Sequence, residues 1–147
     1  MSTNNEKIIW DFLKQQGLTD AGTAGLMGNL FAESNLQSNN LQNTYQKKLG
    51  YTDETYTVAV DNGTYKNFIK DSAGYGLAQW THWSRKEALL KFAQSSNASI
   101  GDMTMQLNYL IKELKSSYKS VISVLQTTTS VKDASDIVLV KFERPAD

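Results

Sequence analysis

Apolar residues recur at helical spacing along most of this 147-residue chain, and this periodicity constrains its fold more than any other feature. Near the amino terminus, Ile8, Ile9, Phe12 and Leu13 repeat as residues on one face of a helix do. A chain of this length can bury a sizeable core within one compact domain. We therefore predict a single, mainly helical domain over residues 1–147.

A second helix is expected directly after the first. Gly17 ends the first helix, Thr19 caps the second, and helical spacing continues to Phe31 before the pattern stops after Asn35. Because glycine weakens a helix interior, a glycine repeat here predicts close packing against a neighbouring element. The repeat consists of Gly22, Gly25 and Gly28.

One short stretch is typical of a β-hairpin. Residues 56–60 alternate as a strand does, Asp61-Asn62-Gly63-Thr64 is a strong turn signal, and residues 65–69 can return as the second strand. No other segment has this pattern, so we expect one small hairpin and no larger sheet. The fold class is mainly α, with this hairpin inserted after the second helix.

The remaining helices are expected from their first residues. Ser84 and Glu87 match a capping box, and Asp102 can cap the helix that follows. Residues 121–125 can form a short helix, and Ser130 starts a last one that Pro145 stops.

Composition excludes several classes of function. The chain has no cysteine, which excludes disulfides and cysteine-based zinc sites. Its 15 basic and 15 acidic residues give no basic excess, so we expect no nucleic-acid partner. The apolar runs are too short for a membrane span, and residues 1–7 lack a signal-peptide core. The lone histidine, His82, is expected at the surface, and we predict neither a metal nor a cofactor.

Glu33 is the first residue that indicates chemistry. It ends an apolar helical turn immediately before a loop, where we expect its carboxyl group to lie half-buried against Leu30 or Phe31. Desolvation would then raise its pKa, and a protonated carboxyl group is what glycoside cleavage requires. The alternative is an ordinary solvated residue at a helix end.

The second informative segment runs from Asp71 to Trp83 and contains Gly74-Tyr75-Gly76-Leu77-Ala78-Gln79-Trp80. Aromatic rings stack on sugars, amides bond hydroxyl and N-acetyl groups, and glycines let the backbone approach a ligand. This composition is typical of a sugar site. The alternative is a turn followed by core tryptophans.

Together these segments resemble the lysozyme superfamily, and most closely the phage tail-type lysozymes. That family is similar to this chain in three ordered motifs, which cover nearly its whole length. The motifs are Met27-Gly28-Asn29 with Glu33-Ser34, Gly74-Tyr75-Gly76-Leu77-Ala78-Gln79-Trp80-Thr81, and Phe142-Glu143-Arg144-Pro145-Ala146.

The resemblance implies a lysozyme-like fold and cleavage of peptidoglycan at the β-1,4 bond between N-acetylmuramic acid and N-acetylglucosamine. Glu33 carries over as the general acid. In the terminal motif, Glu143 and Arg144 are expected to pair and to support the last helix. The residues expected to bind substrate are Ser34, Tyr75, Gln79 and Trp80.

A second catalytic carboxylate is less clearly indicated. Our first choice is Asp71, because it leads into the Gly-Tyr-Gly turn, although an aspartate that only forms the turn fits equally well. Asp61, Asp53 and Glu54 are further candidates. A mechanism with Glu33 alone, giving an anhydro product, is also open.

Four other functions compete with the muramidase interpretation: a lytic transglycosylase, a chitin-directed enzyme, a non-catalytic glycan-binding or tail-structural module, and a helical protein-interaction domain. The expected partner is the peptidoglycan strand, with no membrane partner and with further domains of the same polypeptide. The expected location is extracellular, on a virion or at the cell wall. The abrupt end of the sequence fits a domain cut from a longer protein.

Overall fold

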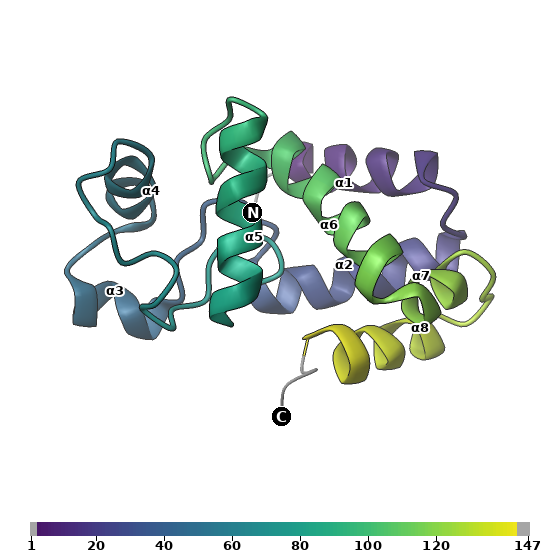
Figure 1. Cartoon of the computed structure of the whole chain (residues 1–147). Coiled ribbons are helices and arrows are strands. Elements are labelled where there is room, and N and C mark those ends of the chain that lie inside the picture. The colour runs from purple at the N-terminus through teal and green to yellow at the C-terminus, as the bar shows by residue number, and fades with distance from the viewer. Residues whose placement is uncertain (1–2, 144–147) are drawn as a thin grey trace. The chain divides into compact units, whose positions relative to one another are not determined.

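The computed structural model describes residues 3–143, and the regular structure of this part of the chain is helical (Figure 1). Its residues divide into two compact units, 3–36 with 110–143 and 37–109, which are described separately below. In chain order the elements are α1 (Thr3–Gln15), α2 (Asp20–Ser34), α3 (Asn43–Leu49), α4 (Asp53–Asp61), α5 (Trp83–Ser95), α6 (Met103–Ser117), α7 (Lys119–Leu125), α8 (Val131–Ile137) and the π-helix η1 (Val138–Glu143).

The mainly helical prediction is confirmed. None of the helices within residues 3–143 is long and apolar enough to span a membrane.

Helix α2 is the central helix of the first unit, where it packs against α1, α7, α8 and η1. Thr19 caps its start as predicted, because the Thr19 hydroxyl accepts a hydrogen bond from the Gly22 amide at 2.9 Å. Its end is fixed by Asn35, which adopts the left-handed conformation with φ 56°. The helix therefore stops at Ser34, which places Glu33 in its last turn.

The glycine repeat of α2 packs closely at two of its three positions. A Cβ atom on Gly22 would lie 2.0 Å from the Leu125 carbonyl oxygen, and one on Gly25 would lie 2.5 Å from the Ala134 Cβ. Only glycine therefore lets α7 and α8 approach α2 this closely. At Gly28 a Cβ would meet nothing within 4 Å, so the prediction of close packing is wrong at that position.

The second unit contains α3, α4, α5 and the first part of α6. The predicted hairpin is absent from it, because residues 56–60 belong to α4. The sequence alternates, yet Tyr56, Ala59 and Val60 also follow the three- and four-residue spacing of a helix, and these are the residues that α4 buries. Residues 65–69 form turns and irregular backbone.

Local hydrogen bonds explain why the helix prevails over the hairpin. Thr52 and Thr55 form a reciprocal capping box, with the Thr55 amide bonded to the Thr52 hydroxyl at 3.1 Å and the Thr52 amide to the Thr55 hydroxyl at 2.8 Å. The expected turn is the end of this helix, where Asn62 is the C-cap and Gly63 has φ 81°. The same residues that favour a hairpin turn thus end a helix.

Other helix boundaries follow their predicted caps with one exception. Asp102 accepts the Met105 amide at 2.9 Å before α6, and Ser130 accepts the Asp133 amide at 3.1 Å before α8. The predicted capping box of Ser84 with Glu87 is wrong, because His82 caps α5. Pro145, the predicted stop after the last helix, lies outside the described residues.

Candidate functional site

Glu33 lies in the last turn of α2 and is exposed. The expected half-burial is therefore wrong: Leu30 is buried within the core, and Phe31 is itself 49% exposed. Helix α2 has no basic residue in its last turn. The Glu33 carboxyl group is thus at the negative end of the helix dipole, where a negative charge is disfavoured.

The residues around Glu33 in the first motif have structural contacts. Ser34 is 2% exposed, and its hydroxyl donates to the Leu30 carbonyl at 3.0 Å within α2. The Asn29 amide donates to the carbonyls of Gly25 and Ser135, each at 3.1 Å, which joins α2 to α8. A direct contact of Ser34 with substrate stays a prediction, and its burial favours a supporting role.

A largely apolar groove of about 670 Å³ opens on the first unit between α1 and α2. We did not predict this groove from the sequence. Its tryptophan, Trp10, belongs to a helix with ordinary amphipathic spacing, which does not indicate a binding site. Glu33 is not among its lining residues. These are Glu6, Lys7, Trp10, Ala24, Met27, Gly28, Phe31 and Leu36.

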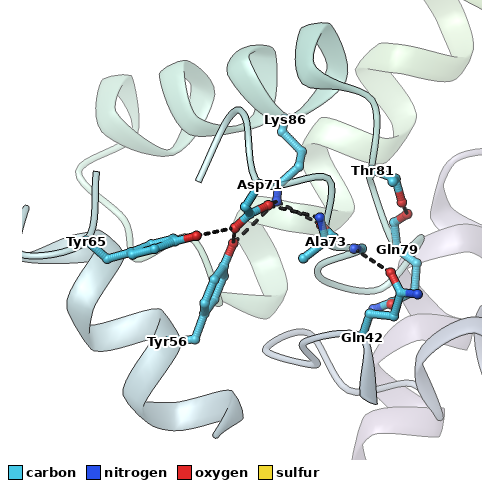
Figure 2. Close-up of polar contacts among 9 residues, drawn as sticks. Gln42, Tyr56, Tyr65, Asp71, Ala73, Gln79, Thr81 and Lys86 are labelled. Atoms are coloured by element: carbon cyan, nitrogen blue, oxygen red, sulfur yellow. Dashed lines mark hydrogen bonds and ion pairs between the residues drawn. The ribbon is translucent and has the colours of Figure 1, made fainter. Parts of the chain in front are cut away.

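In the second unit, Asp71 is held in a buried cluster of polar side chains, shown in Figure 2. Its side chain is 1% exposed and forms an ion pair of 2.7 Å with Lys86, which is fully buried. The hydroxyls of Tyr56 and Tyr65 donate to Asp71 Oδ2 at 2.7 and 2.8 Å, and the Ala73 amide donates to Oδ1 at 2.9 Å. The Asp71 carboxylate therefore faces protein groups in place of solvent.

Burial dominates the electrostatics of this cluster. It lowers the pKa of Lys86, an effect that the neighbouring Asp71 carboxylate opposes. It raises the pKa of both Tyr56 and Tyr65, and their hydrogen bonds to Asp71 raise these pKa values further. The tyrosines consequently remain protonated donors to Asp71. Asp71 shapes the turn through Ala73, as the structural alternative expected, while a catalytic role for it stays a prediction.

The other candidates for a second carboxylate differ among themselves. Asp53 accepts the Leu41 amide and the Gln46 side-chain amide, both at 2.9 Å. Asp61 accepts the Ile100 amide at 3.0 Å and the Ser99 hydroxyl. Glu54 is exposed in the first turn of α4. Asp53 and Asp61 thus serve loop structure as Asp71 does.

Tyr75 and Trp80 belong to the core of the second unit. Both are 0% exposed, and their backbones form an antiparallel bridge with hydrogen bonds of 3.1 and 3.0 Å. The Tyr75 hydroxyl bonds that of Thr57, and the Trp80 ring packs edge-on against Tyr109. This burial matches the alternative of core aromatics, so binding of substrate by these two residues stays a prediction that their position disfavours.

Gln79 is the predicted binding residue in this segment that reaches the surface, since it is half-buried. Its backbone is left-handed, with φ 52°, which costs a residue other than glycine about 1 kcal/mol. Its Nε2 donates to the carbonyls of Asn40 and Gly76 at 2.9 and 3.0 Å and to Asn40 Oδ1 at 3.2 Å. Three acceptors therefore fix the orientation of the Gln79 amide.

An exposed aromatic pair, His82 and Trp83, ends the segment; His82 was expected at the surface, but Trp83 was not among the predicted binding residues. Trp83 is 55% exposed at the start of α5, and its ring lies 5.8 Å from the His82 ring with a 32° tilt. The doubled tryptophan of the sequence was the available signal. Of the two tryptophan rings, that of Trp83 can stack on a ligand, whereas that of Trp80 is buried.

The terminal motif is described only in part. Phe142 is buried in η1, with its ring 5.0 Å from that of Tyr118. Glu143 is the last residue of η1. Arg144 and Ala146 lie outside the described residues, and so does the predicted pairing of Glu143 with Arg144.

A comparison of the chain with known protein families agrees with the three motifs. The sequence model of a family described as phage tail lysozyme matches residues 4–147.

Proposed function

The chain belongs to the phage tail lysozyme family, and on this basis we propose that it cleaves the β-1,4 bond between N-acetylmuramic acid and N-acetylglucosamine in peptidoglycan, with Glu33 as general acid. Membership of the family makes it a peptidoglycan hydrolase of the lysozyme type in general terms. The specific bond and the role of Glu33 are the proposal.

The environment of Glu33 is the observation that carries this assignment. Its carboxyl group is exposed in the last turn of α2, where a substrate oxygen can reach it for proton transfer. Asp53, Asp61 and Asp71 accept hydrogen bonds that shape loops, and the Asp71 side chain is only 1% exposed. The exposed position of Glu33 at the end of α2 therefore supports its assignment as the acid.

In the proposed reaction, Glu33 donates its proton to the glycosidic oxygen while the bond between that oxygen and C1 breaks. The leaving sugar departs as an alcohol, and the remaining ring acquires oxocarbenium character. In hydrolysis a water molecule adds to C1 and loses a proton to the Glu33 carboxylate. The acid is thereby restored for the next cycle.

The hydrogen bonds that the three aspartates accept also favour a second candidate, a lytic transglycosylase that works with one carboxylate. In that reaction the C6 hydroxyl of the same sugar adds to C1, forms an anhydro ring and returns its proton to Glu33. Asp71 then supports the turn before Gly74 without touching substrate. Of the four alternatives Glu54 and Asp61 are exposed, and Asp61 accepts hydrogen bonds from Ser99 and Ile100, so Glu54 is the one that could serve a two-carboxylate mechanism.

Digestion of purified peptidoglycan, followed by mass spectrometry of the new glycan ends, tests both candidates. Hydrolysis yields reducing ends that have gained one water, whereas transglycosylation yields anhydro ends of unchanged total mass. A Glu33→Gln protein with an unchanged circular dichroism spectrum should release neither product. Cleavage confined to peptide bonds would contradict the proposal.

We further propose that the chain acts on a virion or at the cell wall, as part of a polypeptide with additional domains. The family description supports the location on a virion or at the cell wall.

A further inference from the structure

Gly74 is enclosed by the side chain and backbone of Gln42. The backbone amide of Gln42 donates to the Gly74 carbonyl at 2.8 Å, and the backbone amide of Gly74 donates to Gln42 Oε1 at 2.9 Å. This pairing fixes which atom of the Gln42 side chain faces Gly74. The Gln42 Nε2 points elsewhere and donates to the Thr44 hydroxyl at 3.1 Å.

Three side-chain oxygens from separate positions converge beside Gly74. They belong to Gln42, Gln79 and Thr81, whose side chains Figure 2 shows close together. A Cβ atom built on Gly74 would lie 2.8 Å from Gln79 Oε1, 3.2 Å from Thr81 Oγ1 and 3.3 Å from Gln42 Oε1. Any larger residue at this position would therefore displace these oxygens. We call Gln42, Gln79 and Thr81 the acceptor cluster.

The cluster offers acceptors because its donors are directed away. Gln79 Nε2 is occupied by Asn40 and Gly76, and the Thr81 hydroxyl donates to the Gln79 carbonyl at 2.8 Å. Within residues 3–143, Gln79 Oε1 accepts no hydrogen bond. Gln42 and Gln79 are half-buried and Thr81 is exposed, so a ligand can approach.

The three oxygens of the acceptor cluster carry no formal charge, so we expect an uncharged hydrogen-bond donor as their ligand. Without a carboxylate, the three oxygens have little to attract a metal ion, and a hydroxyl ligand would leave its own acceptor oxygen unmatched. An amide N–H only donates, so it fits a set that only accepts. Each sugar of a peptidoglycan strand carries one such group, the N–H of its 2-acetamido substituent.

We propose that the acceptor cluster binds the acetamido N–H of an N-acetylhexosamine, with Gln42 and Thr81 as specificity-determining residues beside Gln79. This inference rests on the proposed glycan substrate and names the substituent that the second unit recognises. It requires Gly74, because a side chain there would occupy the space that the three oxygens share.

Titration of the whole chain with tri-N-acetylchitotriose, and with cellotriose as the probe that lacks acetamido groups, tests the proposal by amide NMR. We expect the Gln42 and Gln79 side-chain signals to shift with the first trisaccharide only. Thr81→Val should weaken its binding about fivefold, the effect of one lost hydrogen bond, and Thr81→Ser should restore it. Thr127→Val, at an exposed threonine of the other unit, is the matched control.

Equal affinity for both trisaccharides, or undiminished binding by folded Thr81→Val, would overturn the inference even if the wild-type protein digests peptidoglycan. Acetamido-dependent binding by a protein that fails to cleave peptidoglycan would support the cluster and contradict the proposed reaction. Melting temperatures of the Thr81 variants separate a lost contact from a lost fold.

Discussion

Glu33 and Asp71 are carboxylates in adjoining sequence motifs, yet they occupy opposite environments. Glu33 is exposed at the end of α2, whereas the Asp71 side chain is 1% exposed and bonded to Lys86, Tyr56 and Tyr65. A carboxylate that must exchange a proton with substrate needs access, and one that holds a buried cation needs enclosure. Exposure therefore distinguishes these two acids, which the sequence motifs alone did not.

The largest expected effect is that of replacing Glu33, the exposed carboxylate of the pair. Glu33→Gln should lower peptidoglycan clearance by at least a hundredfold, because the amide cannot donate the proton that the leaving oxygen needs. The melting temperature should change little, since Glu33 is exposed. Turbidity clearance per folded molecule measures the effect, with Glu87→Gln on α5 as control. Normal clearance by folded Glu33→Gln would exclude Glu33 as the acid.

Replacing Asp71, the buried carboxylate, should lower stability and leave turnover unchanged. Asp71→Asn removes the counter-charge of Lys86 and should lower the free energy of unfolding by about 3 kcal/mol, as expected for a broken buried ion pair. Chemical denaturation measures this loss. Turnover per folded molecule should be retained, so a hundredfold loss of turnover in a fully folded variant would restore Asp71 to the catalytic set.

A pH titration sharpens the comparison without any mutation. Burial raises the pKa of Tyr56 and Tyr75, so their contribution to stability is present below their ordinary value of 10.0 and is lost as the pH rises above it. Lys86, with its lowered pKa, acts in the opposite direction only below its ordinary 10.5. Above about pH 10.5, unfolding should become easier by about 1.4 kcal/mol per pH unit for each buried tyrosine.

Tyrosinate absorbance and circular dichroism should then change together as the protein unfolds in alkali. Tyr56→Phe should reduce the slope by the share of one tyrosine. Ionisation of all seven tyrosines in protein that remains folded would contradict the burial argument.

The smallest expected effect concerns the helix that carries Glu33. Gly28→Ala should raise the free energy of unfolding by about 1 kcal/mol, because alanine favours a helix and its Cβ meets nothing within 4 Å. Gly25→Ala should instead destabilise the protein through contact with Ala134. Thermal unfolding compares the two variants. Reduced clearance by a stabilised Gly28→Ala protein would show that substrate uses this face of α2.

The sequence predicted helices best where a side chain ends or begins them. Thr19, Asp102 and Ser130 act as the caps expected, because a short polar side chain before an apolar run has few other uses. Residues 56–60 failed because alternation and helical spacing coexist in a segment this short. The helix prevails because it buries Tyr56, Ala59 and Val60 together in the core of the second unit.

The site was predictable in outline and less so in detail. Motifs located Glu33 and Gln79, but a pattern of letters does not reveal whether an aromatic ring faces a ligand or a core, and Tyr75 and Trp80 proved buried. Lys86 gave no signal at all, because an isolated lysine within a helix ordinarily lies at the surface. Its burial depends on Asp71, fifteen positions away along the chain.

The Asp71 cluster gives this cysteine-free chain an internal cross-link of another kind. It joins α4 through Tyr56, the turn through Ala73 and α5 through Lys86, as a disulfide joins separate segments in many secreted proteins. Such a link needs no oxidant to form and no reductant can open it. Its stability depends on pH instead, so we expect the second unit to unfold first in alkali.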